Sequence, residues 1–147
     1  MADLGDFARI GAEDNGLCVV TTLRANGTIQ ASVVNAGVLA HPVSGESVVG
    51  FVAMGGSRKL ANLRVRPRVT LVARSGWQWT AVEGTVELLG PDDSIAGIDA
   101  EALRLALRAV FVAAGGDHDD WAEYDRAMAA ERRTIAFVIP ERVYSNG

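Results

Sequence analysis

Six segments of the chain arrange apolar and polar residues in the patterns of β-strands. Some alternate between the two classes, and residues 17–23 are continuously apolar and β-branched, which is typical of a buried strand. Asn26-Gly27 follows that segment, and this dipeptide is a strong signal for a hairpin turn. The predicted strands are residues 17–23, 28–40, 47–54, 68–74, 77–89 and 132–144. A bulge is expected at Glu83-Gly84, and Pro140 should mark a sheet edge or a bend.

Four further segments are predicted to be helices, at residues 4–12, 57–65, 98–114 and 117–130. Leu60 and Leu63, three residues apart, should face the core from the second helix, and Pro67 stops that helix. Gly115-Gly116 ends the third helix, and Asp117 is expected to cap the fourth. About six antiparallel strands with these flanking helices predict an α+β chain whose sheet closes into a small barrel.

Length and composition place the chain among ordinary globular proteins. Its 147 residues, 49% of them hydrophobic, suit one domain over residues 1–147 with a single core. No apolar run approaches the roughly 20 residues of a membrane-spanning helix, and the acidic N-terminus lacks the features of a signal peptide. Cys18 is the only cysteine, which excludes an intrachain disulfide and suggests inert packing in a buried strand. We therefore expect a cytoplasmic protein with no membrane partner.

The charge balance changes this picture at one residue. A formal net charge of -4 argues against general nucleic-acid binding, which requires a basic face. Lys59 is the only lysine among 14 cationic side chains. A retained lysine can mark a position that needs a compact ammonium group, and it can equally result from drift.

Lys59 lies in the one segment whose local pattern indicates chemistry, Gly55-Gly56-Ser57-Arg58-Lys59. The glycines allow a sharp turn, and Ser57 is a good N-cap for the helix that follows. Two cations in the first helical turn are unfavourable by about 0.3–1 kcal/mol each, because the helix dipole is positive there. A bound phosphate would remove the conflict by accepting hydrogen bonds from the free amides and the Ser57 hydroxyl. A capped helix whose cations point into water fits the local pattern equally well.

The stretch from Met54 through Ser57-Arg58-Lys59, with Leu63, Pro67 and Leu71 after it, resembles the cofactor segment of the pyridoxamine 5′-phosphate oxidase-like split β-barrel family. The preceding hairpin and the strand at residues 77–84 are also similar to that family. Overall length, strand order and the tryptophan-containing segment 117–128 resemble its actinobacterial members that bind the deazaflavin coenzyme F420. The resemblance covers nearly the whole chain, but only the Gly-Ser-Arg-Lys segment is specific.

The resemblance implies an FMN-binding-like split β-barrel that forms a homodimer with cofactor sites at the subunit interface. One subunit would hold the phosphate with Ser57, Arg58, Lys59 and Asn62. The backbone of Ser32, Val33, Val34 and Asn35, and that of Ala53 and Met54, would lie beside the cofactor ring. Trp77 and Trp79 would contact the cofactor from the partner subunit, although large alternating aromatic residues on a strand usually serve packing.

The resemblance implies a deazaflavin-dependent reductase that transfers hydride from F420 to a small unsaturated organic substrate. The alternatives are an FMN-binding oxidoreductase, a carrier that binds F420 or flavin without turnover, and a scaffold without any cofactor. No side chain is compelling as a general acid, so no catalytic residue is predicted and the proton should come from water. The C-terminal segment 139–147 has one arginine and no histidine, so oxidation of pyridoxine phosphate is not expected.

The sequence contains no motif for metal binding, serine hydrolysis or a P-loop. His41 and His118 are isolated and show no metal-ligand spacing, so no metal site is predicted. The Gly-x-Ser-x-Gly elbow of serine hydrolases is absent. Lys59 also lacks the glycine spacing of a phosphate-binding P-loop.

Overall fold

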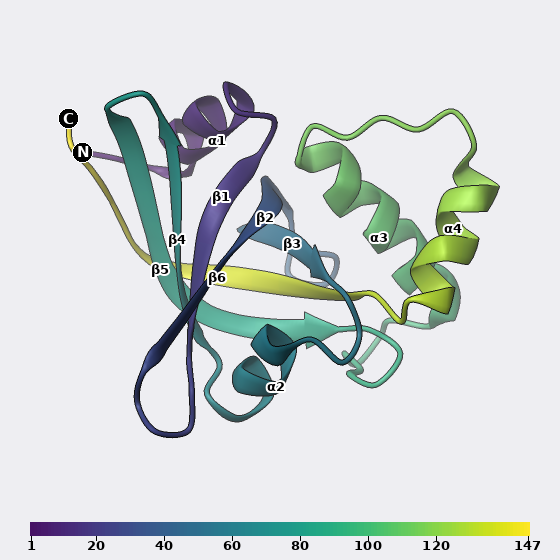
Figure 1. Cartoon of the computed structure of the whole chain (residues 1–147). Helices are drawn as coiled ribbons and strands as arrows, with labels where there is room; N and C mark the ends of the chain where they lie inside the picture. The colour runs from purple at the N-terminus through teal and green to yellow at the C-terminus, as the bar shows by residue number, and fades with distance from the viewer.

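Six antiparallel strands form a closed barrel in a computed structural model of the chain, which describes residues 1–147 (Figure 1). The order around the barrel is β1-β2-β3-β6-β5-β4, and β4 pairs back onto β1. The strands are β1 (Leu17–Leu23), β2 (Ile29–Ala40), β3 (Ser47–Ala53), β4 (Arg68–Ser75), β5 (Gln78–Leu89) and β6 (Thr134–Ser145). This confirms the predicted α+β barrel, with strand ends within two residues of those expected.

The barrel wall follows the alternation in the sequence. In β1, Cys18 and Val20 point into the core, whereas Leu17 and Val19 point outward. The expected irregularity in β5 is confirmed, because Glu83 pairs with Arg142 while Gly84 pairs with Pro140. One extra residue on β6 therefore lies opposite the Glu83-Gly84 step and bends the longest strand pair.

Four helices surround the barrel: α1 (Leu4–Ala12), α2 (Arg58–Val65), α3 (Ala100–Ala113) and α4 (Trp121–Ala130). Figure 1 shows α1 and α2 at opposite ends of the barrel. Phe7 and Ile10 of α1 and Leu63 of α2 join the larger core cluster with the inward side chains of the strands. Helices α3 and α4 lie together on one side, where Leu107, Val110 and Tyr124 form a second cluster with β3 and β6.

The predicted cap of α4 is wrong. Asp120 caps this helix by accepting a hydrogen bond from the Glu123 backbone N–H at 3.1 Å, and Asp117 lies in the loop before it. Asp117, Asp119 and Asp120 are all suitable caps, so the local pattern does not separate them. Packing of Trp121 and Tyr124 against Phe111 of α3 fixes where the helix begins.

Two smaller observations complete the fold. Cys18 is buried in the barrel, and burial raises the pKa of its thiol to about 12, which makes it an unreactive core residue as expected. No helix has the length and apolar content needed to span a bilayer.

Candidate functional site

The wall of the closed barrel has a seam between β2 and β3. These strands pair only from Ala36 opposite Phe51 to Ala40 opposite Ser47. Before Ala36, β2 pairs with β1 alone, and after Phe51, β3 pairs with β6 alone. The strands therefore diverge and leave a split in which one edge of β2 has no partner strand. Ser32, Val33, Val34 and Asn35 lie on one side of the split, and Ala53 and Met54 lie on the other.

A short, fixed turn connects β3 to α2 at the edge of this split. The Gly55 backbone N–H donates to the carbonyl of Glu131 at 3.1 Å, and a Cβ at Gly55 would lie 2.7 Å from the Cβ of Arg132. Gly56 has φ +80°, a conformation that favours glycine. The two glycines thus hold the turn against the connection between α4 and β6 and set the position of the first turn of α2.

Ser57 occupies the N-cap position of α2, as expected, but its side chain forms no capping hydrogen bond. Its Oγ is buried and has no hydrogen-bond partner. Leaving a buried hydroxyl unsatisfied costs about 1–3 kcal/mol, so such groups are rare unless a ligand or water completes them. The Ser57 hydroxyl therefore does not cap the helix. It is one of two buried hydroxyls without a partner, the other being that of Thr80 in β5, and it is the one that lies at the start of α2.

Arg58 and Lys59 follow Ser57, and neither side chain forms a hydrogen bond or an ion pair with the rest of the chain. The first turn of α2 contains no acidic residue that would offset their charge. Free backbone N–H groups, a buried hydroxyl and two uncompensated cations meet at one helix start. This combination of donors and charge fits a phosphate group.

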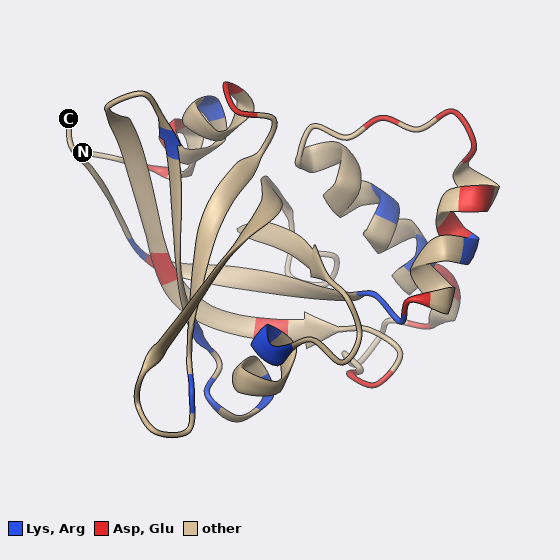
Figure 2. Cartoon of the chain, viewed as in Figure 1, with Lys and Arg blue, Asp and Glu red and all other residues tan.

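A groove of about 660 Å³ continues from Arg58 between α2 and the β1–β2 hairpin. Arg24, Arg58 and Arg66 line it, and no carboxylate does; we call it the basic groove. Arg24 donates to the carbonyl of Ile29 at 3.0 Å and Arg66 donates to that of Leu23 at 2.9 Å, so both are fixed without losing their charge. Figure 2 shows this basic character at α2 and the chain beside it, and acidic residues gathered on α4 and the preceding loop.

Arg24 and Arg66 were not expected from the sequence. The spacing of Arg58, Asn62 and Arg66 at every fourth residue is the signal that places them on one helix face. Asn62 is buried, and its amide donates to Thr22 Oγ1 at 3.0 Å and to Gln30 Oε1 at 3.1 Å. It therefore ties α2 to the hairpin and offers only its own oxygen to a ligand.

Trp77 and Trp79 lie away from these residues within one chain. They belong to the β4–β5 hairpin, at the end of the barrel opposite α2 (Figure 1). Trp77 is 93% exposed. Trp79 is half-buried and packs edge-on against Tyr144, with 6.0 Å between the ring centroids. Contact with a cofactor at the split requires a second subunit, and this role stays a prediction.

Comparison with known proteins identifies relatives of this barrel. A family model described as pyridoxamine 5'-phosphate oxidase matches residues 7–144. Among solved structures, the conserved hypothetical protein Rv2991 from Mycobacterium tuberculosis superposes with a TM-score of 0.69 at 18% identity, covering 99% of this chain and 84% of the other.

Two further similar structures are described by a cofactor that the protein binds or uses. A pyridoxamine 5'-phosphate oxidase-related, FMN-binding protein from Nostoc punctiforme has a TM-score of 0.66 at 14% identity, covering 99% of this chain and 84% of the other. A structure described as an F420 reductase has a TM-score of 0.56 at 17% identity, covering 87% of this chain and 88% of the other. At these identities the similarity shows a shared fold.

Proposed function

Since the chain belongs to the pyridoxamine 5'-phosphate oxidase family, we propose that it binds coenzyme F420 in the split and uses it to reduce a small unsaturated organic substrate. The observation that carries this proposal is the buried, unpartnered hydroxyl of Ser57 beside the uncompensated Arg58 and Lys59. In a family that includes redox proteins, such a constellation next to an open seam supports a phosphorylated redox cofactor.

The residues of the chain would divide the work of binding. Ser57, Arg58, Lys59 and the free amides of α2 hold the phosphate, while the unpaired edge of Ser32–Asn35 and the backbone of Ala53-Met54 orient the ring. The bound reduced deazaflavin supplies hydride to the substrate. The protein excludes water from the ring and leaves one face open, and the proton comes from solvent.

The basic groove favours F420 over FMN. FMN ends in a monophosphate, for which Ser57, Arg58 and Lys59 suffice. In F420 the phosphate is a diester that continues into a tail of carboxylates. Arg24 and Arg66 lie beyond Arg58 in a groove without any carboxylate, which suits such an extension.

The outer surface of β1, β2 and β4 supports the homodimer. Val33 of β2 is 61% exposed and lies opposite Val19 of β1, which is 41% exposed. On its other side, Val19 lies opposite Val72 of β4. A contiguous apolar surface beside the split suits a second copy of the chain. In the proposed dimer the Trp77 end of one subunit would lie beside the split of the other.

Cofactor titration with matched variants tests the proposal. We expect wild-type protein to bind F420, and Lys59→Ala to bind it roughly 10- to 100-fold more weakly, because a charged hydrogen bond contributes about 1.5–3 kcal/mol. The readout is the fluorescence of the deazaflavin. Arg126→Ala removes one charge from an exposed part of α4 and should bind like wild type.

The same titration separates the two cofactors. Arg24→Gln should weaken F420 and leave FMN unchanged, because only F420 reaches the basic groove. Equal affinity of wild type and Lys59→Ala for both cofactors would contradict the phosphate site. A carrier would bind F420 but fail to oxidise the reduced form when an electron acceptor is added.

A further inference from the structure

A second cavity lies on the helical side of the split, apart from the basic groove. It holds about 410 Å³ between the β2–β3 seam and the α3–α4 pair, within the range of small-molecule sites. Asn35 and Val52 line it, and they are the first residues beyond the last β2–β3 pair. The cavity, which we call the helix-side pocket, therefore adjoins the seam where the ring is proposed to lie.

The pocket has an apolar body. Its apolar lining consists of Val52, Val110, Phe111, Ala114, Tyr124 and Met128. The Tyr124 hydroxyl donates to the carbonyl of Leu107 at 3.0 Å, and burial raises its pKa to about 12. Tyr124 is thus a neutral, fixed wall, and its proton is already engaged.

The polar groups of the pocket are hydrogen-bond donors. Arg133 pairs with Glu131 through Nε and Nη2, both at 2.8 Å, which leaves Nη1 without a partner. Asn35 donates one amide hydrogen to the carbonyl of Asn15 at 2.9 Å and keeps the other. Because Glu131 balances the charge of Arg133, the pocket offers donors with little net charge, which favours a neutral oxygen acceptor over a carboxylate.

We propose that the helix-side pocket is the substrate site, and that it takes a neutral conjugated carbonyl compound that carries an apolar ring. This inference rests on the proposed function. The ring of the substrate lies among Val52, Phe111 and Met128, and its carbonyl oxygen accepts from Arg133 and Asn35. Hydride supplied by the reduced cofactor would form a C–H bond at the β-carbon. The Cα=Cβ π pair would become the double bond of an enolate while the C=O π pair moves to the oxygen, and a solvent proton would then add at the α-carbon as the carbonyl re-forms. The substrate gains two electrons and the cofactor is oxidised.

Binding to cofactor-free protein tests the pocket without any turnover. The probes are 4-phenylbut-3-en-2-one, a neutral conjugated ketone, and cinnamate, its carboxylate counterpart, followed by ligand-observed NMR. We expect the ketone to bind more tightly than cinnamate. Val52→Phe should fill the cavity and weaken the ketone at least tenfold, whereas Val112→Phe, on the exposed side of α3, should not.

Arg133→Gln provides a second test that leaves the apolar lining intact, should Val52→Phe fail to fold. It should weaken the ketone several-fold and reduce the preference over cinnamate. Unchanged ketone binding in Val52→Phe or Arg133→Gln, or tighter binding of cinnamate, would overturn the inference. F420 titration of the same proteins separates the two proposals: wild type that binds F420 but not the ketone refutes only the pocket, and wild type that binds the ketone but not F420 refutes only the proposed function.

Discussion

The hydroxyl of Ser57 shows how a single residue can indicate a ligand. Serine at an N-cap ordinarily satisfies a backbone amide of its own helix. Here the side chain is buried and unpartnered, and the amides of the first turn stay free. The sequence could predict Ser57 as the first residue of the site, but the orientation of its side chain depends on the contact of Gly55 with Glu131 and Arg132, which is a tertiary feature.

Replacing Ser57 should separate stability from binding. Ser57→Ala loses no hydrogen bond of the cofactor-free chain, so its free energy of unfolding should equal or exceed that of wild type by up to about 1 kcal/mol. Its affinity for F420 should nevertheless fall. Urea unfolding and fluorescence titration measure the two quantities.

Thr22→Val is the matched control for Ser57→Ala. The Thr22 hydroxyl is also buried but accepts from Asn62 at 3.0 Å, so its loss should destabilise the chain by about 1–3 kcal/mol. If Ser57→Ala were destabilised as much as Thr22→Val, the Ser57 hydroxyl would have a partner within the chain.

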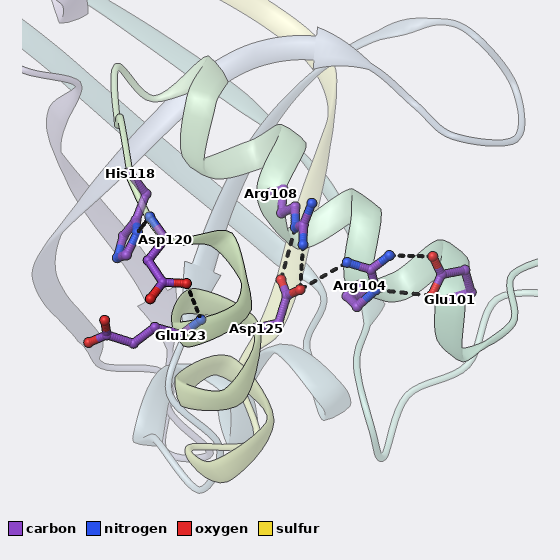
Figure 3. A network of polar contacts seen from close by, with 7 residues as sticks. All are labelled: Glu101, Arg104, Arg108, His118, Asp120, Glu123 and Asp125. Atoms are coloured by element: carbon purple, nitrogen blue, oxygen red, sulfur yellow. Dashed lines mark hydrogen bonds and ion pairs between the residues drawn. The ribbon is translucent and has the colours of Figure 1, made fainter.

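At the scale of elements, an ion network joins α3 to α4 (Figure 3). Asp125 accepts from Arg108 at 2.9 and 2.5 Å and from Arg104 at 2.9 Å, and Arg104 also pairs with Glu101. The guanidinium of Arg108 lies 5.3 Å from the ring centre of Trp121. Hydrogen bonds from Arg108, and then from Arg104, lower the pKa of Asp125 to about 2.

Acid should therefore loosen the helical pair. An aspartate in the unfolded chain titrates near about pH 4, so the network stabilises the fold fully above that value and loses its effect as the pH falls toward 2. We expect the fluorescence of Trp121, measured with Trp77 and Trp79 replaced by phenylalanine, to change in this window. Asp125→Asn should already show the altered signal at neutral pH, and Asp117→Asn, an exposed loop variant, should behave like its parent.

The elements themselves were largely predictable, because each has a local signal. Asn26-Gly27 marks the first hairpin, and Gly115, with φ +93°, follows α3. The start of α4 was missed because it depends on aromatic packing between helices. Arg24 and Arg66 were missed because the hairpin and α2 meet only in the folded barrel.

For the molecule as a whole, the exposed valines of β1 and β2 predict assembly. Wild-type protein should elute at twice the mass of one 15.5 kDa chain. Val33→Asp should give monomers, because a carboxylate is costly to bury in an apolar interface, and should also weaken F420. Val43→Asp, an equally exposed valine in the β2–β3 turn, should remain dimeric. A monomeric wild type would contradict the proposed dimer.

The divergence of β2 from β3 also has a consequence for the cofactor-free protein. A strand edge with free amides and carbonyls is a template on which other polypeptides can polymerise, and this edge carries Ile29 and Val33 with no lysine to discourage such growth. We therefore expect newly made chains to be prone to edge-to-edge aggregation, and the F420 proposed to bind in the seam would cover this edge. The coenzyme would then act as a chaperone of its own apoprotein, and cells starved of it should accumulate insoluble protein.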